Sequence, residues 1–134
     1  IQKGITLHRA IDAYTDAHPA TKQAIQILQP AAGRYAGAFV DVVYDHFLAN
    51  DVTAFATQHQ LQQMAQYTYA VLQAYANHLP ERFIQILPYM QQHNWLANYA
   101  QHWGVQKSFH GIAHRATYFN NAEPVYALFQ QNYL

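Results

Sequence analysis

Cysteine is absent from the 134 residues of this sequence, and charged residues are scarce. The absence of cysteine excludes disulfide bonds and thiolate metal sites, and it is compatible with a reducing compartment. Charged side chains make up 10% of the residues, well below the roughly 25% of an average soluble domain. Seven basic residues balance seven acidic ones, so no net field draws the chain towards nucleic acid or a membrane.

Long apolar runs are missing as well. No run approaches the roughly 20 residues of a membrane span, and no signal-peptide pattern opens the sequence. The sequence begins at Ile1 rather than at a methionine, and we expect an N-terminal segment of the natural chain to precede it.

Hydrophobic residues make up 51% of the sequence, which is enough to bury a core without disulfide bonds. Apolar residues recur at helical spacing, and no stretch alternates as a β-strand would. This periodicity predicts helices over residues 5–14, 19–28, 34–50, 60–78, 80–90, 105–117 and from 124 onward, with a short segment near 95–103. We predict an all-α fold, a compact helical bundle that forms a single domain over residues 1–134.

Prolines and the composition of one helix refine this prediction. Pro19 suits the first turn of a helix, where its missing N–H costs nothing, and Pro30 is expected to end that helix. The predicted helix over 34–50 carries apolar residues around most of its circumference, so we expect it to be buried in the core.

Four of the seven carboxylates lie in two short segments that also contain histidine. The first segment contains His8, Asp12 and Asp16, and the second contains Asp41, Asp45 and His46. Within each segment the carboxylates are four residues apart, and His8 precedes Asp12 by the same interval. On a helix this spacing places side chains on one face, close enough to share a ligand.

Carboxylates stacked on an apolar helix repel one another and lose hydration, and a divalent cation relieves both penalties. Carboxylate oxygen with neutral imidazole nitrogen suits Mn²⁺, Fe²⁺, Zn²⁺ or Mg²⁺, and helical bundles assemble such sites from facing helices. The alternative is that these side chains are solvated surface residues, and Asp16 is placed to cap the helix that begins near Pro19. His110 and His114 are also four residues apart on a predicted helix. This spacing would suit a metal or phosphate pair, but we favour the interpretation that they are surface histidines.

Several stretches match one known family in the same order along the chain. They are residues 4–12 with Thr15, Asp16 and Pro19, then residues 41–48, and further on Pro80-Glu81-Arg82-Phe83, Trp95-Leu96 and residues 111–115. On these residues the chain resembles the acyl carrier protein phosphodiesterase family over nearly its whole length. The motifs around His8-Arg9 and Asp45-His46 are specific together, whereas the later stretches are weaker individually.

The resemblance implies a reaction and a set of site residues. Such enzymes remove 4′-phosphopantetheine from holo acyl carrier protein by hydrolysing its phosphodiester to a serine. They are thought to be divergent, HD-type metal phosphohydrolases with an all-α, HD-domain-like fold, and they use a divalent ion, typically manganese. The family also has an earlier segment with an aspartate of the presumed site, which this chain lacks.

The motif match assigns a role to each candidate residue. The expected metal ligands are His8, Asp12, Asp45 and His46. By the chemistry of phosphodiester hydrolysis, Asp12 or Asp45 would accept the proton of the attacking water if one of them is left free of the metal. Arg9 or Arg115 would hold the phosphate. Asp16, Asp41 and Arg115 are expected around the metal or the substrate.

The resemblance also implies an acidic protein partner, holo acyl carrier protein, in the bacterial cytoplasm, with no nucleic-acid or membrane partner. A basic rim near the metal would favour this partner. The available cations are Lys3, Arg9, Lys22, Arg34, Arg82, Lys107 and Arg115. Two other functions stay open: a metal phosphohydrolase for a nucleotide or another small phosphodiester, and a helical binding module without catalysis.

Overall fold

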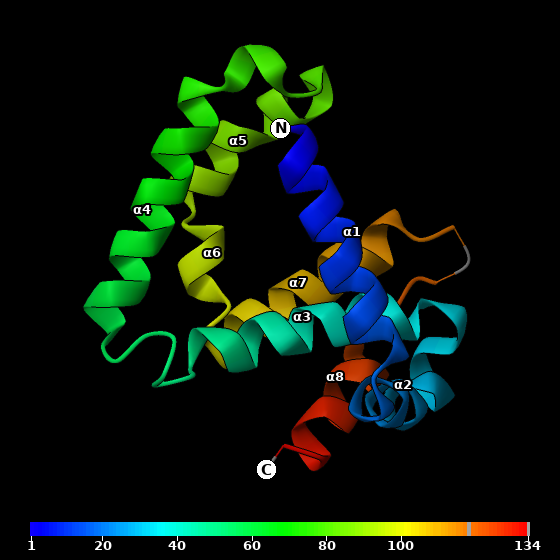
Figure 1. The fold of residues 1–134 in the computed structure, drawn as a ribbon. Helices are drawn as coiled ribbons and strands as arrows, with labels where there is room; N and C mark the ends of the chain where they lie inside the picture. The colour runs from blue at the N-terminus through cyan, green and yellow to red at the C-terminus, as the bar shows by residue number, and fades with distance from the viewer. Residues whose placement is uncertain (118, 134) are drawn as a thin grey trace. The chain divides into compact units, whose positions relative to one another are not determined.

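The computed structural model describes residues 1–117 and 119–133 of the chain. Every regular element among these residues is a helix, which confirms the predicted all-α fold (Figure 1). The α-helices are α1 (Gln2–Ala17), α2 (Pro19–Ala32), α3 (Ala36–Ala49), α4 (Gln58–Ala74), α5 (Glu81–Gln92), α6 (Trp95–Asn98), α7 (His102–Arg115) and α8 (Glu123–Gln131), and the 3₁₀ turns are η1 (Gly33–Tyr35) and η2 (Ala76–His78). Among the described residues, no helix is both long enough and apolar enough to span a membrane.

The chain divides into two compact units. Unit 1 comprises Ile1–Asp41 and Phe109–Leu134, and unit 2 comprises Val42–Ser108. The division falls within α3 and within α7, so each of these helices contributes residues to both units. The expectation of a single domain over residues 1–134 stays a prediction.

Unit 1 is built around aromatic rings from several helices. Helix α2 packs against α1 and α8 (Figure 1). Phe39 and Phe109 are fully buried, and their rings meet edge to face with centroids 4.9 Å apart. Phe129 of α8 contacts Phe109 at 6.0 Å between ring centroids. Such edge-to-face pairs stabilise a core beyond the effect of their buried area.

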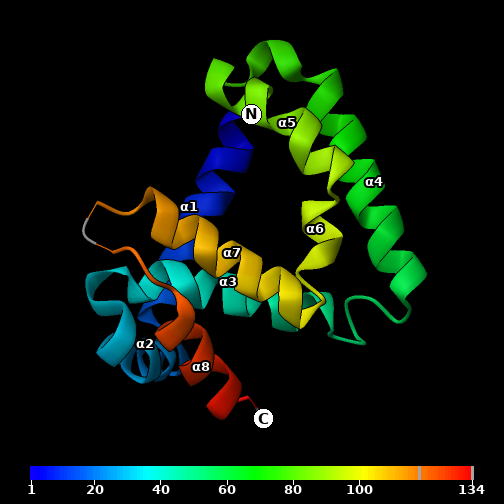
Figure 2. The ribbon, with the colours of Figure 1, turned by 180° about the vertical axis from the view of Figure 1, so that it is seen from behind.

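Unit 2 has a core of α4, α5 and α6, which pack side by side (Figures 1 and 2). Leu61, Ala65 and Tyr69 form the buried face of α4. The Tyr69 hydroxyl donates to Asn94 Oδ1 at 3.0 Å and accepts from the Leu96 N–H at 2.9 Å. These hydrogen bonds satisfy the buried hydroxyl and fix the start of α6 against α4.

Two local predictions around α2 are wrong. Asp16 lies inside α1 rather than at an N-cap, because α1 continues to Ala17. The cap of α2 is His18, whose Nδ1 accepts the Ala20 N–H at 3.1 Å. Pro30 does not end α2, since a proline removes only one hydrogen bond. The helix continues to Ala32, and its C-cap is Gly33, which has a φ of 57°.

The prediction that the helix over 34–50 is buried holds for only part of α3. Phe39, Val40 and Val42 are buried. Phe47 and Leu48, however, are 43% and 55% exposed. The second half of α3 therefore presents apolar side chains at the surface of unit 2.

Candidate functional site

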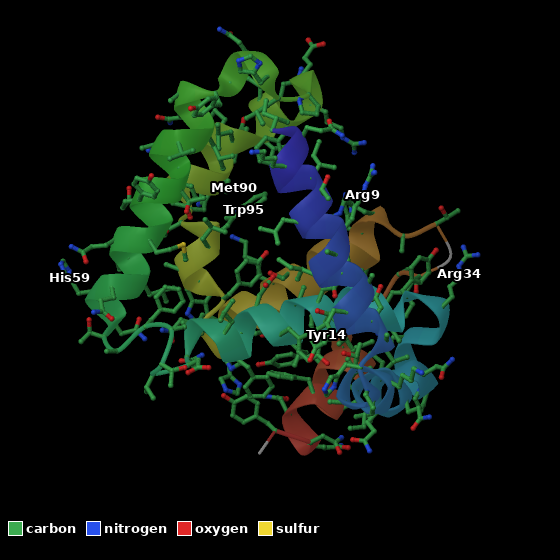
Figure 3. All side chains as sticks on the ribbon, viewed as in Figure 1. Arg9, Tyr14, Arg34, His59, Met90 and Trp95 are labelled. Atoms are coloured by element: carbon green, nitrogen blue, oxygen red, sulfur yellow. The ribbon has the colours of Figure 1, made fainter. Side chains whose placement is uncertain are left out.

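Helix α1 brings the first pair of predicted ligands together. His8 Nε2 lies 3.2 Å from Asp12 Oδ2, and the two side chains are 76% and 57% exposed. The contact arises because residues four apart share one face of a helix. Arg9 extends from the same helix (Figure 3). This exposed segment therefore presents an imidazole, a carboxylate and a guanidinium to solvent.

Asp41 lies within the electrostatic reach of two other candidate carboxylates. Its pKa is raised above the ordinary value, first by burial and then by the negative charges of Asp16 and Asp12. The charges of Asp12 and Asp16 therefore act on Asp41 within unit 1. A cation bound there would favour all three ionised forms.

His46 is the most enclosed of the candidate residues. Its side chain is 1% exposed, and Nδ1 lies 2.7 Å from the carbonyl oxygen of Tyr99. Because a carbonyl oxygen only accepts, Nδ1 carries the hydrogen, and in the neutral ring Nε2 carries the lone pair. A backbone carbonyl that fixes the tautomer in this way is usual for metal-binding histidines.

The environment also favours the neutral form of His46. Burial lowers the pKa of His46, the hydrogen bond to Tyr99 partly opposes this, and the nearby His102 lowers the pKa further. The rings of His46 and His102 meet edge to face, with centroids 5.2 Å apart. The imidazole is therefore held in the form that binds a metal ion or accepts a proton.

Asp45 precedes His46 in α3 but lies on a different side of the helix: His46 is buried, whereas Asp45 is exposed. Consecutive helical residues are about 100° apart around the axis. Asp45 is exposed and lines a pocket of about 200 Å³. The other lining residues are Leu48, Ala49, Phe55, Leu61, Met64, Leu96 and Tyr99.

The candidate ligands suit a divalent ion in their chemistry, and His8 and Asp12 lie close enough to share one. Carboxylate oxygen and neutral imidazole nitrogen are ligands of Mn²⁺, Fe²⁺, Zn²⁺ and Mg²⁺. Within the described part of the chain, no group of three or more His, Cys, Asp or Glu side chains is arranged to hold a metal ion. His8 and Asp12 lie in unit 1, whereas Asp45 and His46 lie in unit 2. The metal site therefore stays a prediction.

The remaining polar candidates lie in unit 1. Arg115, in the last turn of α7, folds its guanidinium back over Gly111, 3.5 Å from the place a Cβ would occupy. His110 Nε2 pairs with Glu123 Oε1 at 2.7 Å. Because Glu123 is in the first turn of α8, this half-exposed pair connects α7 to α8 and favours a structural role for His110.

Sequence reasoning missed the residues that hold His46 in place. Tyr99 supplies the carbonyl, and Asn50 Nδ2 donates to the carbonyl oxygens of His46, at 2.9 Å, and Ala100, at 3.0 Å. Asn50 thereby connects the end of α3 to the turn before α7. No sequence motif marks these partners, because backbone carbonyls are supplied by any residue type.

Comparison with known proteins places these residues in a family context. The family described as acyl carrier protein phosphodiesterase matches residues 1–134. A protein of Enterobacter sp. strain 638 named acyl carrier protein phosphodiesterase is 30% identical over 112 residues, which cover 84% of this chain and 58% of that protein. A protein of the same name from Salmonella agona strain SL483 is 30% identical over 115 residues, covering 86% of this chain and 60% of the relative. The chain thus spans about three fifths of the length of these relatives, and no solved structure matches it.

Proposed function

Because the chain belongs to the acyl carrier protein phosphodiesterase family, we propose that the whole protein hydrolyses the phosphodiester between 4′-phosphopantetheine and a serine of holo acyl carrier protein. The products are the apo carrier protein and free 4′-phosphopantetheine. The family match over residues 1–134 is the observation that carries this proposal. The fixed, neutral imidazole of His46 supports it, because a metal phosphodiesterase needs such a ligand.

The proposed site would hold a divalent ion, Mn²⁺ by the family resemblance, with His8, Asp12, Asp45 and His46 as ligands. When bound to these residues, such an ion would supply a coordinated water of lowered pKa and would balance the charge that develops on the phosphate oxygens. Of Asp12 and Asp45, the one left free of the ion would accept the proton of the attacking water. Arg9 and Arg115 supply paired N–H donors to the phosphate, a geometry that lysine does not offer.

The proposed partner is holo acyl carrier protein, and the proposed location is the bacterial cytoplasm. The alternative of a small phosphodiester substrate shares the same ligands. The family name of the relatives favours the carrier protein. An HD-like arrangement of the site belongs to this proposal as well.

Hydrolysis of holo acyl carrier protein by the full-length protein tests the proposal. With added Mn²⁺ we expect release of 4′-phosphopantetheine, loss of this release with a chelator, and a decrease of about 10²-fold or more in kcat/KM for His8→Ala and Asp45→Asn. His59→Ala and Glu81→Gln are matched controls, because both residues are exposed and lie outside the proposed site. Both controls should retain wild-type activity.

The other outcomes separate the alternatives. Metal binding without release of 4′-phosphopantetheine would point to a different phosphoester substrate. Neither release nor metal binding by the folded protein would leave a helical binding module as the better account.

A further inference from the structure

The pocket that Asp45 lines is largely apolar, and the proposed reaction assigns no role to its apolar residues. All eight of its lining residues belong to unit 2. They come from α3, α4, α6, the loop after α3 and the turn after α6. Leu61 and Ala49, at 1% and 7% exposure, are its buried walls, whereas Leu48 lies at its rim with 55% exposure. An open pocket with this lining suits an apolar group of a ligand.

The position of Asp45 determines which part of the substrate reaches this pocket. Asp45 lines the pocket and is also a proposed ligand of the reacting phosphate's metal ion, so this step rests on the proposed function. The scissile phosphate would then lie near the carboxylate end of the pocket. The occupant must be the group bonded next to that phosphate.

The two sides of the phosphodiester differ in polarity. On the carrier-protein side, the phosphate is followed by a serine methylene and then by the peptide backbone, whose buried polar groups would need partners. On the prosthetic side, it is followed by a methylene and a quaternary carbon with two methyl groups, the gem-dimethyl centre of the pantoyl unit. Only the prosthetic side therefore offers a compact apolar group one methylene away from the phosphate ester.

The size of the pocket agrees with this assignment. The pocket measures about 200 Å³, and an apolar cavity of about 150 Å³ is enough for a benzene molecule. A pantoyl unit has about eight heavy atoms, and so it is only slightly larger than benzene. The pocket thus has room for the pantoyl unit.

The wall of the pocket is fixed relative to the helix that carries Asp45. Tyr99 lines the pocket, and its carbonyl oxygen accepts from His46 Nδ1 at 2.7 Å. Asn50 adds a second connection, from the end of α3 to Ala100 at 3.0 Å. A preformed pocket of this kind loses little conformational entropy on binding.

From this arrangement we infer that the pocket lined by Asp45, Leu48, Ala49, Leu61 and Met64 binds the gem-dimethyl pantoyl group and selects the prosthetic arm of the substrate. The carrier protein itself then contributes less to recognition in unit 2. The specificity-determining residues are Leu48 and Ala49, because they lie within one helical turn of Asp45.

A substrate comparison tests this inference. Full-length protein with Mn²⁺ is given holo acyl carrier protein with the natural arm, and holo acyl carrier protein whose arm has hydrogens in place of the two methyl groups. For the wild type we expect kcat/KM to be about 10-fold or more lower with the second substrate, since missing apolar groups typically cost this much. The same two substrates are then compared in two variants: Ala49→Leu, which fills the pocket, and Leu48→Ala, which removes a side chain at its rim.

In both variants we expect kcat/KM for the natural substrate to decrease about 10-fold and the difference between the two substrates to shrink to about threefold or less. Ile84→Ala, a partly exposed residue of α5 outside the pocket, should behave as the wild type with both substrates. A wild-type enzyme that hydrolyses both substrates equally well would overturn the pocket assignment and leave the proposed function intact. Absence of hydrolysis by the wild type would overturn the proposed function and this inference together.

Discussion

A single histidine connects the candidate chemistry of unit 2 to its stability. The pKa of His46 is lowered from 6.5, chiefly by burial. As the pH falls, the imidazole is therefore protonated in the unfolded state before it is protonated in the folded state. Because the pKa of His46 is lower in the folded than in the unfolded protein, the contribution of His46 to stability is fully present above its unfolded pKa. It is lost as the pH falls from about 6.5 towards the folded pKa of His46.

We therefore expect acid to destabilise the protein partly through His46. The free energy of unfolding should fall by up to about 1.4 kcal/mol per pH unit below pH 6.5 from this group. In His46→Gln this component should disappear, so that urea denaturation between pH 8 and pH 5 shows a shallower slope. His59→Gln removes an exposed histidine and should keep the wild-type slope. Identical slopes for all three proteins would contradict the assignment.

At the residue scale, the sequence predicted contacts within a helix but not contacts between helices. The His8–Asp12 contact follows from a spacing of four residues on one helix. The hydrogen bond from His46 to Tyr99 joins residues 53 positions apart, and its acceptor is a backbone carbonyl. Neither the partner nor the burial of His46 is encoded in a local pattern, because both result from tertiary packing.

At the scale of the elements, the glycines of α3 and α7 have opposite roles. A Cβ at Gly104, near the start of α7, would overlap with the backbone carbonyl of Asn98. A Cβ at Gly37, in the first turn of α3, would meet nothing within 4 Å. Gly104 is therefore needed for close approach of two backbone segments, whereas Gly37 only adds conformational entropy to the unfolded chain.

Alanine substitutions at these two positions should consequently change stability in opposite directions. We expect Gly104→Ala to lower the free energy of unfolding by about 2–4 kcal/mol, because backbone must move to relieve the overlap. Gly37→Ala should raise it by about 0.5–1 kcal/mol, the usual gain of alanine over glycine in a helix. Urea denaturation at one pH measures both values. A mild effect of Gly104→Ala would show that the turn before α7 adapts easily.

Element boundaries show where propensity arguments fail. Periodicity identified the helices, because their apolar stripes are set by burial. The ends were less predictable: α2 passes through Pro30, and its cap is His18, a residue type that is not among the preferred caps. The exposure of Phe47 and Leu48 in the second half of α3 was also missed, because an apolar sequence alone does not distinguish a buried helix from a partly exposed one.

On the scale of the whole molecule, the distribution of charge bears on how an acidic carrier protein is recognised. Unit 1 carries five of the seven basic side chains and four of the seven acidic ones. Unit 2 carries the other two basic and three acidic side chains. Neither unit thus has more than one charge in excess, and all seven basic side chains are exposed. A strong long-range field towards an acidic partner is not available from such a surface.

If the proposed function holds, catalysis on holo acyl carrier protein should depend only weakly on ionic strength. Electrostatically steered association falls steeply as salt is added, because the Debye length shortens from about 14 Å at 50 mM to about 6 Å at 300 mM. For this protein kcat/KM should fall by about threefold or less over that range, measured with full-length protein at constant Mn²⁺. A fall of 10-fold or more would show that the few basic residues form a concentrated docking surface. Weak salt dependence would instead mean that recognition rests on short-range contacts with the prosthetic arm, because such contacts are insensitive to screening.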